Sequence, residues 1–199
     1  GSSLIECARY PFRDGDSGHV AKSYSELVEA IEDLRGNDHE FKTLIVDTVD
    51  SLEPLIWRHV CDRDSKSSGK RIESIEDYGY GKGYQIALDE WRAFCHQLDG
   101  LRSAKQMDVI LLGHAHVRTF KNPEGEDYDR YSLRVHDKAG GFLREWVDVL
   151  GFAAFEGGAV KGKDDKRARG YSTGARPVHF ERAAAYDAKA RLPLPPSME

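Results

Sequence analysis

The chain has 199 residues, 40% hydrophobic and 32% charged, which is typical of a globular protein with one domain. The net charge of −5 does not indicate nucleic-acid binding by the surface as a whole, although local basic segments can still bind it. No apolar run approaches the roughly 20 residues of a membrane span, and no signal peptide opens the chain. Three widely spaced cysteines (Cys7, Cys61, Cys95) exclude a disulfide framework and a zinc site, so we expect a cytoplasmic protein without a membrane partner.

The first readable elements form an αβ unit. A polar turn over residues 13–18 precedes a predicted helix that begins after Ser23 and ends at Gly36. Residues 42–48 then read Lys-Thr-Leu-Ile-Val-Asp-Thr, an apolar run typical of a strand buried on both faces of a parallel sheet. The short connection between helix and strand favours that parallel arrangement.

Asp47 stands at the carboxyl end of this strand, which is the edge of an open α/β sheet where ligands bind. An aspartate there can hold Mg²⁺ through a water beside the phosphates of a nucleotide, as in a Walker B strand. The alternative is a core strand whose aspartate caps a helix that begins near Thr48.

The next segments alternate between helices and polar loops. Residues 52–60 are predicted to be helical, and residues 62–76 are predicted to be a mobile loop. Residues 78–84 contain three glycines, three tyrosines and one lysine, which suit close backbone approach, base stacking and phosphate contact. A flexible surface loop is the alternative. Residues 85–101 are predicted to form a long amphipathic helix.

Residues 108–113 repeat the buried apolar run, and His114 follows them. His114 could sense a γ-phosphate, position a water or have only a structural role. A polar loop over 117–130, a strand over 131–135, a helix from about 138 and a strand over 149–155 are predicted to follow. Near the end we expect a β-hairpin with a basic tip at 161–170 and a return strand at 177–182.

The sequence resembles the phage nucleotide-binding proteins of the RecA-like ATPase class, often described as phage AAA-domain proteins. The resemblance lies in the order and spacing of four segments: the strand that ends on Asp47, the glycine-rich segment, the strand that ends on His114, and residues 185–191. The resemblance implies an α/β fold, a RecA-like three-layer sandwich with a mostly parallel central sheet and a C-terminal β-hairpin. It implies one core over 1–192 and a mobile tail over 193–199.

The resemblance also implies function. Such a protein uses ATP and Mg²⁺, binds single-stranded DNA and promotes annealing in phage recombination. Its partners would be further copies of itself, in a ring or filament, and a phage single-strand binding protein, in the cytoplasm of a bacterial host cell.

Roles follow for the matching positions. Asp47 resembles the Walker B aspartate on Mg²⁺, with Thr48 also at the nucleotide, and His114 resembles the residue that ends the sensor strand. Lys189 and Arg191 resemble the basic pair that reaches the nucleotide of a neighbouring subunit, as an arginine supplied in trans does in phosphoryl transfer. The expected DNA contacts come from two loops: Tyr80, Lys82, Tyr84, Arg118 and Lys121.

One departure limits this expectation, because the sequence has no phosphate loop of the form GxxxxGK[ST]. We therefore expect weak or no ATP binding by this chain, as a truncated form or as a member that has lost the site; Glu6 is a candidate for the catalytic glutamate. Two alternatives remain. One is a nucleotide-free DNA-binding or structural module, and the other is a metal-dependent nuclease that uses Asp47, Asp50, His114 and His116.

Overall fold

The computed structural model describes residues 21–160 and 169–199. Glu6, the polar turn at 13–18 and most of the basic hairpin tip therefore lie outside the described residues. The chain divides into two compact units, the first formed by Gly1–His114 with Arg134–Gly141 and the second by Ala115–Leu133 with Phe142–Glu199. In residues 21–160 and 169–199, no helix combines the length and the apolar character needed to cross a membrane.

The first unit contains the predicted αβ unit. Helix α1 (Tyr24–Gly36) is capped by the Ser23 hydroxyl, which accepts a hydrogen bond from the Glu26 N–H at 3.2 Å. Strand β1 (Thr43–Asp47) follows after a short connection. Three further elements complete the order: α2 (Val49–Ser68), the 3₁₀ helix η2 (Ile75–Tyr78) and α3 (Lys82–Lys105), before β2 (Asp108–Leu112).

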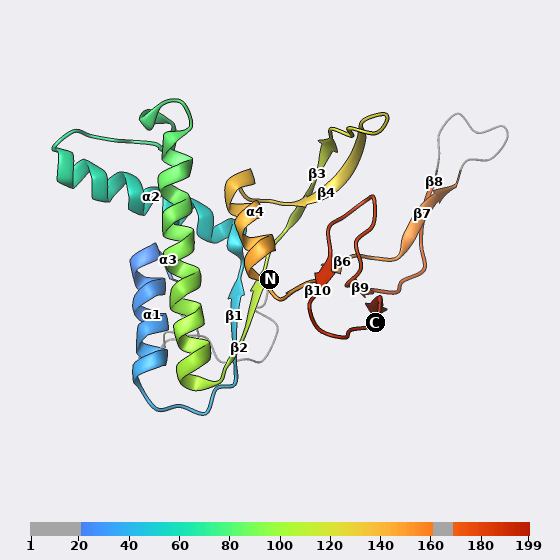
Figure 1. Ribbon diagram of the computed structural model, residues 1–199, viewed down its shortest axis with the longest axis horizontal. Helices are drawn as coiled ribbons and strands as arrows, with labels where there is room; N and C mark the ends of the chain where they lie inside the picture. The colour runs from blue at the N-terminus through green and yellow to red at the C-terminus, as the bar shows by residue number, and fades with distance from the viewer. Residues whose placement is uncertain (1–20, 161–168) are drawn as a thin grey trace. The chain divides into compact units, whose positions relative to one another are not determined.

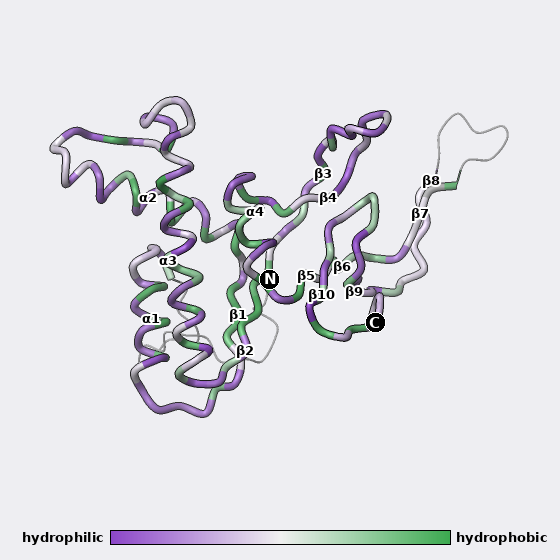
Figure 2. The backbone as a smooth tube through the Cα atoms, viewed as in Figure 1, coloured by the Kyte–Doolittle hydropathy of each residue, from purple (hydrophilic) through white to green (hydrophobic). Residues whose placement is uncertain are grey.

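Strands β1 and β2 are hydrogen-bonded neighbours and run parallel, as predicted, with Thr43 opposite Asp108 and Asp47 opposite Leu112. Figure 1 shows α1 and α3 side by side along this pair. Figure 2 shows both strands as largely hydrophobic. Burial on both faces was wrong, however, because Ile45, on the face opposite the buried Val46, is 54% exposed. Among the described residues every other strand pair is antiparallel, so a mostly parallel central sheet is not seen.

The core of the first unit is built by α3 together with α1 and α2. Helix α3 buries large side chains at helical spacing, and burial of each contributes roughly 1.5–3 kcal/mol. The fully buried side chains are Ile31 from α1, Ile56 and Val60 from α2, and Trp91, Phe94, Cys95, Leu98 and Leu101 from α3. The long helix was thus predicted correctly in its centre and extends by several residues at each end.

Helix α2 is longer than predicted, because residues 62–68, which were expected to be a mobile loop, are helical. Two contacts explain the difference. Arg63 forms ion pairs with Asp64 (2.8 Å) and with Glu90 of α3, which attach the charged end of α2 to its neighbour. The Ser68 hydroxyl also donates to the Asp64 carbonyl one turn earlier.

In the second unit, residues 117–130 were predicted to be a loop, but only 121–127 connect two strands and the rest of that range lies within them. Strand β3 (Ala115–Phe120) pairs antiparallel with β4 (Tyr128–Leu133), and the rings of Phe120 and Tyr128 lie 5.2 Å apart at the far end. This cross-strand pair stabilises a hairpin that polar composition did not indicate. Helix α4 (Asp137–Trp146) begins in the first unit and ends in the second.

The remaining strands are short and antiparallel. The predicted strand 149–155 is divided into β5 (Val149–Leu150) and β6 (Phe152–Ala153), which pair with β10 (Lys189–Ala190) and β9 (Val178–His179). A C-terminal hairpin is present, but β7 (Gly157–Val160) returns through β8 (Arg169–Ser172) and not through 177–182. The segment expected to be a mobile tail contains β11 (Ser197–Met198), which pairs with β9.

Candidate functional site

The carboxyl ends of β1 and β2 carry the first group of polar residues. The Asp47 side chain is exposed at the end of β1. Thr48, the next residue, caps α2, since its hydroxyl accepts from the Ser51 N–H at 3.3 Å and contacts the Ser51 hydroxyl at 3.0 Å. Because Thr48 provides the cap, the carboxylate of Asp47 is left to meet a ligand.

Asp50, in the first turn of α2, organises the end of β2. Its side chain is only 3% exposed, and Oδ1 accepts a hydrogen bond from the His114 N–H at 3.0 Å. The other oxygen, Oδ2, lies 3.0 Å from His114 Nδ1 and 3.3 Å from Nη2 of Arg134. The Arg134 N–H in turn donates to the His114 carbonyl at 2.8 Å. One buried carboxylate therefore fixes two residues that are 20 positions apart in the sequence.

The charge of Asp50 is stabilised in place. Burial by itself would raise the pKa of Asp50, but hydrogen bonds from the His114 backbone and from the Thr48 and His114 side chains outweigh it and lower the pKa to about 2. An imidazole that faces a carboxylate through Nδ1 carries its proton there, so Nε2 is available to accept or donate a hydrogen bond. With a 64% exposed side chain, His114 can present that nitrogen to a ligand.

Glu53, one turn further along α2, is a second buried carboxyl. Both of its oxygens lie 3.0 Å from the His136 N–H, which donates to them. Burial raises the pKa of Glu53 to about 7; the His136 N–H opposes the rise and the charge of Asp50 adds to it. Asp50 and Glu53 thus hold the residues just after β2 and just after β4, respectively.

The glycine-rich segment has structural reasons for its glycines. Gly79 and Gly81 adopt positive φ angles of 67° and 68°, and a Cβ on Gly83 would lie 2.2 Å from the Ile75 carbonyl oxygen. Tyr80 also has a positive φ (50°), which is rare for a bulky residue, and its side chain is fully exposed. Lys82 is exposed at the start of α3.

Tyr84 is placed differently, because its ring is already packed. It stacks on His136, with ring centroids 3.9 Å apart and planes at 8°, and meets Trp57 edge to face at 5.5 Å. Its hydroxyl also donates to Glu76. Stacking of a nucleobase on Tyr84 would require it to leave this packing, whereas Tyr80 could stack without rearrangement.

The other predicted site residues lie in the second unit. Lys189 and Arg191 bind the carboxyl end of α4: Lys189 Nζ donates to the carbonyls of Arg144 and Glu145, and Arg191 Nη2 donates to that of Glu145 at 2.8 Å. Arg191 also pairs with Asp148 at 3.1 Å. On β3, Arg118 is exposed, and Lys121 just beyond it pairs with Asp127.

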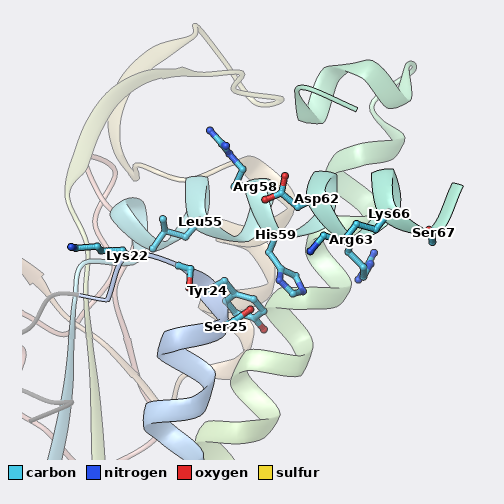
Figure 3. Close-up of a pocket in the computed structure, with 11 residues that line it drawn as sticks. Lys22, Tyr24, Ser25, Leu55, Arg58, His59, Asp62, Arg63, Lys66 and Ser67 are labelled. Atoms are coloured by element: carbon cyan, nitrogen blue, oxygen red, sulfur yellow. The ribbon is translucent and has the colours of Figure 1, made fainter. Parts of the chain in front are cut away.

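A basic cavity of about 590 Å³ lies between the start of α1 and the middle of α2 (Figure 3). Its ionisable lining residues are Lys22, Arg58, His59, Asp62, Arg63 and Lys66. Figure 3 shows His59 turned toward Tyr24, while Arg58 points away from them. The basic side chains do not converge on one point, which distinguishes this surface from the Asp50 cluster.

The described residues contain no group of three or more His, Cys, Asp or Glu side chains that could hold a metal ion. Asp47 therefore stands as a single carboxylate, which suits Mg²⁺, an ion often bound through one or two carboxylates with waters and substrate phosphates. A fully protein-ligated metal centre of the kind a nuclease would use has no support in residues 21–160 and 169–199.

Comparison with known proteins identifies the family. The sequence model of one protein family, described as an AAA domain, matches residues 10–192. The chain belongs to the AAA domain family. No curated protein and no solved structure matches. Membership in this family indicates a nucleotide-binding, ATPase-like function.

Sequence reasoning missed Arg134 and assigned Asp50 only to an alternative metal site. The available signal was the pair Asp50 and Glu53, three residues apart directly after a helix cap, which places two carboxylates on one face of α2. No local pattern could connect either of them to Arg134 or His136, because those contacts span 83 or 84 residues of chain.

Proposed function

We propose that this AAA domain is the RecA-like core of a phage-type recombination ATPase, with a three-layer sandwich completed around the β1–β2 pair. One observation carries the proposal: a buried Asp50 holds the exposed His114 at the sheet edge where Asp47 ends the neighbouring strand. A carboxylate suited to Mg²⁺ and an oriented imidazole at the ends of adjacent parallel strands support binding of a nucleotide's terminal phosphate at this edge.

The residues present fit one side of an ATP–Mg²⁺ site. Asp47 would hold the metal through water, with Thr48 beside it, and His114 would keep its Nδ1 proton toward Asp50 while Nε2 faces a phosphate oxygen or a water. ATP would supply the phosphoryl group to be transferred. The sequence has no phosphate loop of the form GxxxxGK[ST] to surround the phosphates, so this chain by itself is expected to bind ATP weakly or not at all.

Single-stranded DNA is the second proposed ligand. Tyr80 offers an exposed ring for base stacking, and Lys82 offers a charge for phosphate on the same loop. Arg118 and Lys121 would add phosphate contacts from the β3–β4 hairpin. Such binding would not read sequence, and we propose that it serves the annealing of two strands.

We also propose a homo-oligomer, a ring or filament, in which Lys189 and Arg191 reach the nucleotide of a neighbouring copy. Both side chains now bind the end of α4, so the trans role requires that they leave these carbonyls on assembly. A phage single-strand binding protein and the cytoplasm of a bacterial host cell complete the proposal.

The test uses the full-length gene product. Asp47→Ala should lower Mg²⁺-dependent ATP hydrolysis by roughly a hundredfold or more, because the carboxylate that would hold the metal through water is removed. Asp108→Ala is the matched control, since Asp108 is an exposed aspartate at the opposite end of the same strand pair. Equal hydrolysis by both variants would remove Asp47 from the site.

A nucleotide-free DNA-binding module is the second candidate, and the missing phosphate loop favours it. The two proposals differ in one measurement. If the full-length gene product binds single-stranded DNA with the same affinity in the presence and absence of ATP and Mg²⁺, and hydrolyses no ATP, the module is the better description.

A further inference from the structure

Arg134 has no role in the function proposed above, yet it shares its anchor with His114. Its Nη2 lies 3.3 Å from Asp50 Oδ2, the same oxygen that faces His114 Nδ1 at 3.0 Å. Because the Asp50 side chain is almost completely buried, one fixed negative charge holds the exposed side chains of both His114 and Arg134. Such an anchor orients both groups without consuming their remaining donors.

The donors that remain point to an anion. The Arg134 side chain is 61% exposed, and its guanidinium, with five N–H donors, meets Asp50 through an ion pair at Nη2. The Arg134 backbone is fixed as well, since its N–H donates to the His114 carbonyl at 2.8 Å. Arginine is always charged and matches the geometry of phosphate oxygens in pairs.

We infer that Arg134 and His114 together form a binding site for the terminal phosphate of a nucleotide, with Arg134 as a cation supplied by the same subunit. The inference rests on the proposed function for the identity of the nucleotide, but the anion site follows from the Asp50 cluster alone. It adds a cis cation to a site whose expected basic pair, Lys189 and Arg191, binds the end of α4 in this structure.

Position supports the same ligand. His114 follows β2 by two residues, and Asp50 follows β1 by three, so the cluster lies at the carboxyl edge of the parallel pair. That edge is where open α/β sheets bind their ligands. Oxygens of a phosphate can accept hydrogen bonds from the guanidinium of Arg134, and the same carboxylate holds the His114 ring.

The experiment is a titration of the 199-residue chain with inorganic pyrophosphate at low salt and without metal, followed by the ring-nitrogen NMR signals of its histidines. The His114 signal should move in a saturable way, while those of His39, His59 and His96 should not. In Arg134→Gln the apparent Kd should rise by roughly fivefold or more, the effect of losing one charge-assisted contact, and Arg134→Lys should fall between the two.

Arg102→Gln is the matched control, because it removes one exposed arginine of the same unit, at the end of α3. The resulting variant has the same net charge as Arg134→Gln. It should change the Kd by less than about twofold. Equal effects of Arg102→Gln and Arg134→Gln, or no saturable movement of the His114 signal in the unsubstituted chain, would overturn the inference.

A second titration, with a short thymidine oligonucleotide, separates the sources of phosphate. If only the oligonucleotide moves the His114 signal and depends on Arg134, the site takes a strand backbone and the assignment to a terminal phosphate is wrong. Failure of ATP hydrolysis in the full-length protein would leave the pyrophosphate result standing, so the two proposals can fail separately.

Discussion

Asp50 and His114 are joined twice, by a hydrogen bond from the His114 N–H to Oδ1 and by a contact of 3.0 Å between Nδ1 and Oδ2. The same carboxylate also forms an ion pair with Arg134. The Arg134 N–H donates to the His114 carbonyl, and these two residues flank the β3–β4 hairpin in the sequence. Asp50 therefore orients a candidate phosphate-binding imidazole. It also holds together His114 and Arg134, the residues before and after that hairpin.

We predict that Asp50→Asn loosens this connection. The substitution keeps the shape of the side chain but removes the charge, so the bonds to His114 and Arg134 weaken from charge-assisted to neutral. Amide hydrogen exchange at His114 and Arg134 should accelerate by roughly tenfold, since local opening becomes about 1.4 kcal/mol easier. Asp62→Asn, at an exposed position of the same helix, should leave both rates unchanged; unchanged rates in Asp50→Asn would contradict the anchoring role.

Glu53 should make stability depend on pH. Its pKa is raised from the ordinary value of 4.5 to about 7, so the folded state holds this proton more tightly than the unfolded state does. The stabilisation from this proton, about 3 kcal/mol, is complete below about pH 4.5 and is lost as the pH rises through about 7. Chemical unfolding at pH 4.5 and at pH 7.5 should show that Glu53→Gln removes this part of the pH dependence.

Asp50 acts in a different pH range, which keeps the two groups separable. Its lowered pKa contributes stability above the ordinary value of 3.8 that disappears as the pH falls toward 2.

If the pH dependence between 4.5 and 7.5 were identical in Glu53→Gln and the unsubstituted chain, burial of an ionisable Glu53 would be refuted.

In the second unit, Asp187 contacts three arginines: Arg144 at 2.6 Å, Arg130 at 2.7 Å and Arg182 at 3.6 Å. Arg130 is buried, and its guanidinium lies over the Phe120 ring. Asp187→Ala should therefore destabilise this unit by roughly 3–5 kcal/mol, because it leaves a buried positive charge without its partner. Glu181→Ala, at an exposed position nearby in sequence, should change the free energy of unfolding by less than about 0.5 kcal/mol, and equal losses would contradict the role of Asp187.

The two tyrosines of the glycine-rich segment should behave differently. Tyr80→Ala should weaken binding of single-stranded DNA by roughly fivefold or more, the cost of one base stack, without changing thermal stability. Tyr84→Ala should lower stability, because its ring packs against Trp57 and His136. Binding assays and thermal unfolding on the same two variants check both statements. A silent Tyr80→Ala in a protein that binds DNA would place the DNA site elsewhere.

Local patterns in the sequence predicted the parts that depend on periodicity. The apolar runs before Asp47 and His114 indicated adjacent parallel strands, and the spacing of apolar residues indicated α1 and α3. One part that failed depends on a distant contact. The charged end of α2 is helical because Arg63 reaches Glu90, 27 residues later. The β3–β4 hairpin failed for another reason: its contact between Phe120 and Tyr128 is local, but its residues are too polar to indicate strands.

The candidate site divides along the same line. Asp47 and His114 could be proposed from the sequence because each stands at the end of an apolar run, and the carboxyl ends of parallel strands form the ligand edge. Arg134 could not, because it follows a polar hairpin and acquires its position only through Asp50, 84 residues earlier in the chain. The glycines at 79, 81 and 83 were expected either to let a ligand approach or to form a flexible surface loop, and the structure adds that their conformations and close contacts suit the turn itself.

The most direct test of the central claim is Mg²⁺-dependent ATP binding by the full-length gene product, measured by calorimetry for the unsubstituted protein and for His114→Ala and Asp108→Ala. We predict micromolar binding that His114→Ala weakens by roughly tenfold, as loss of an oriented contact to a charged phosphate would, and that Asp108→Ala leaves intact. Binding that is equally strong in all three proteins, or absent from the unsubstituted protein, would contradict a nucleotide site at the carboxyl ends of β1 and β2.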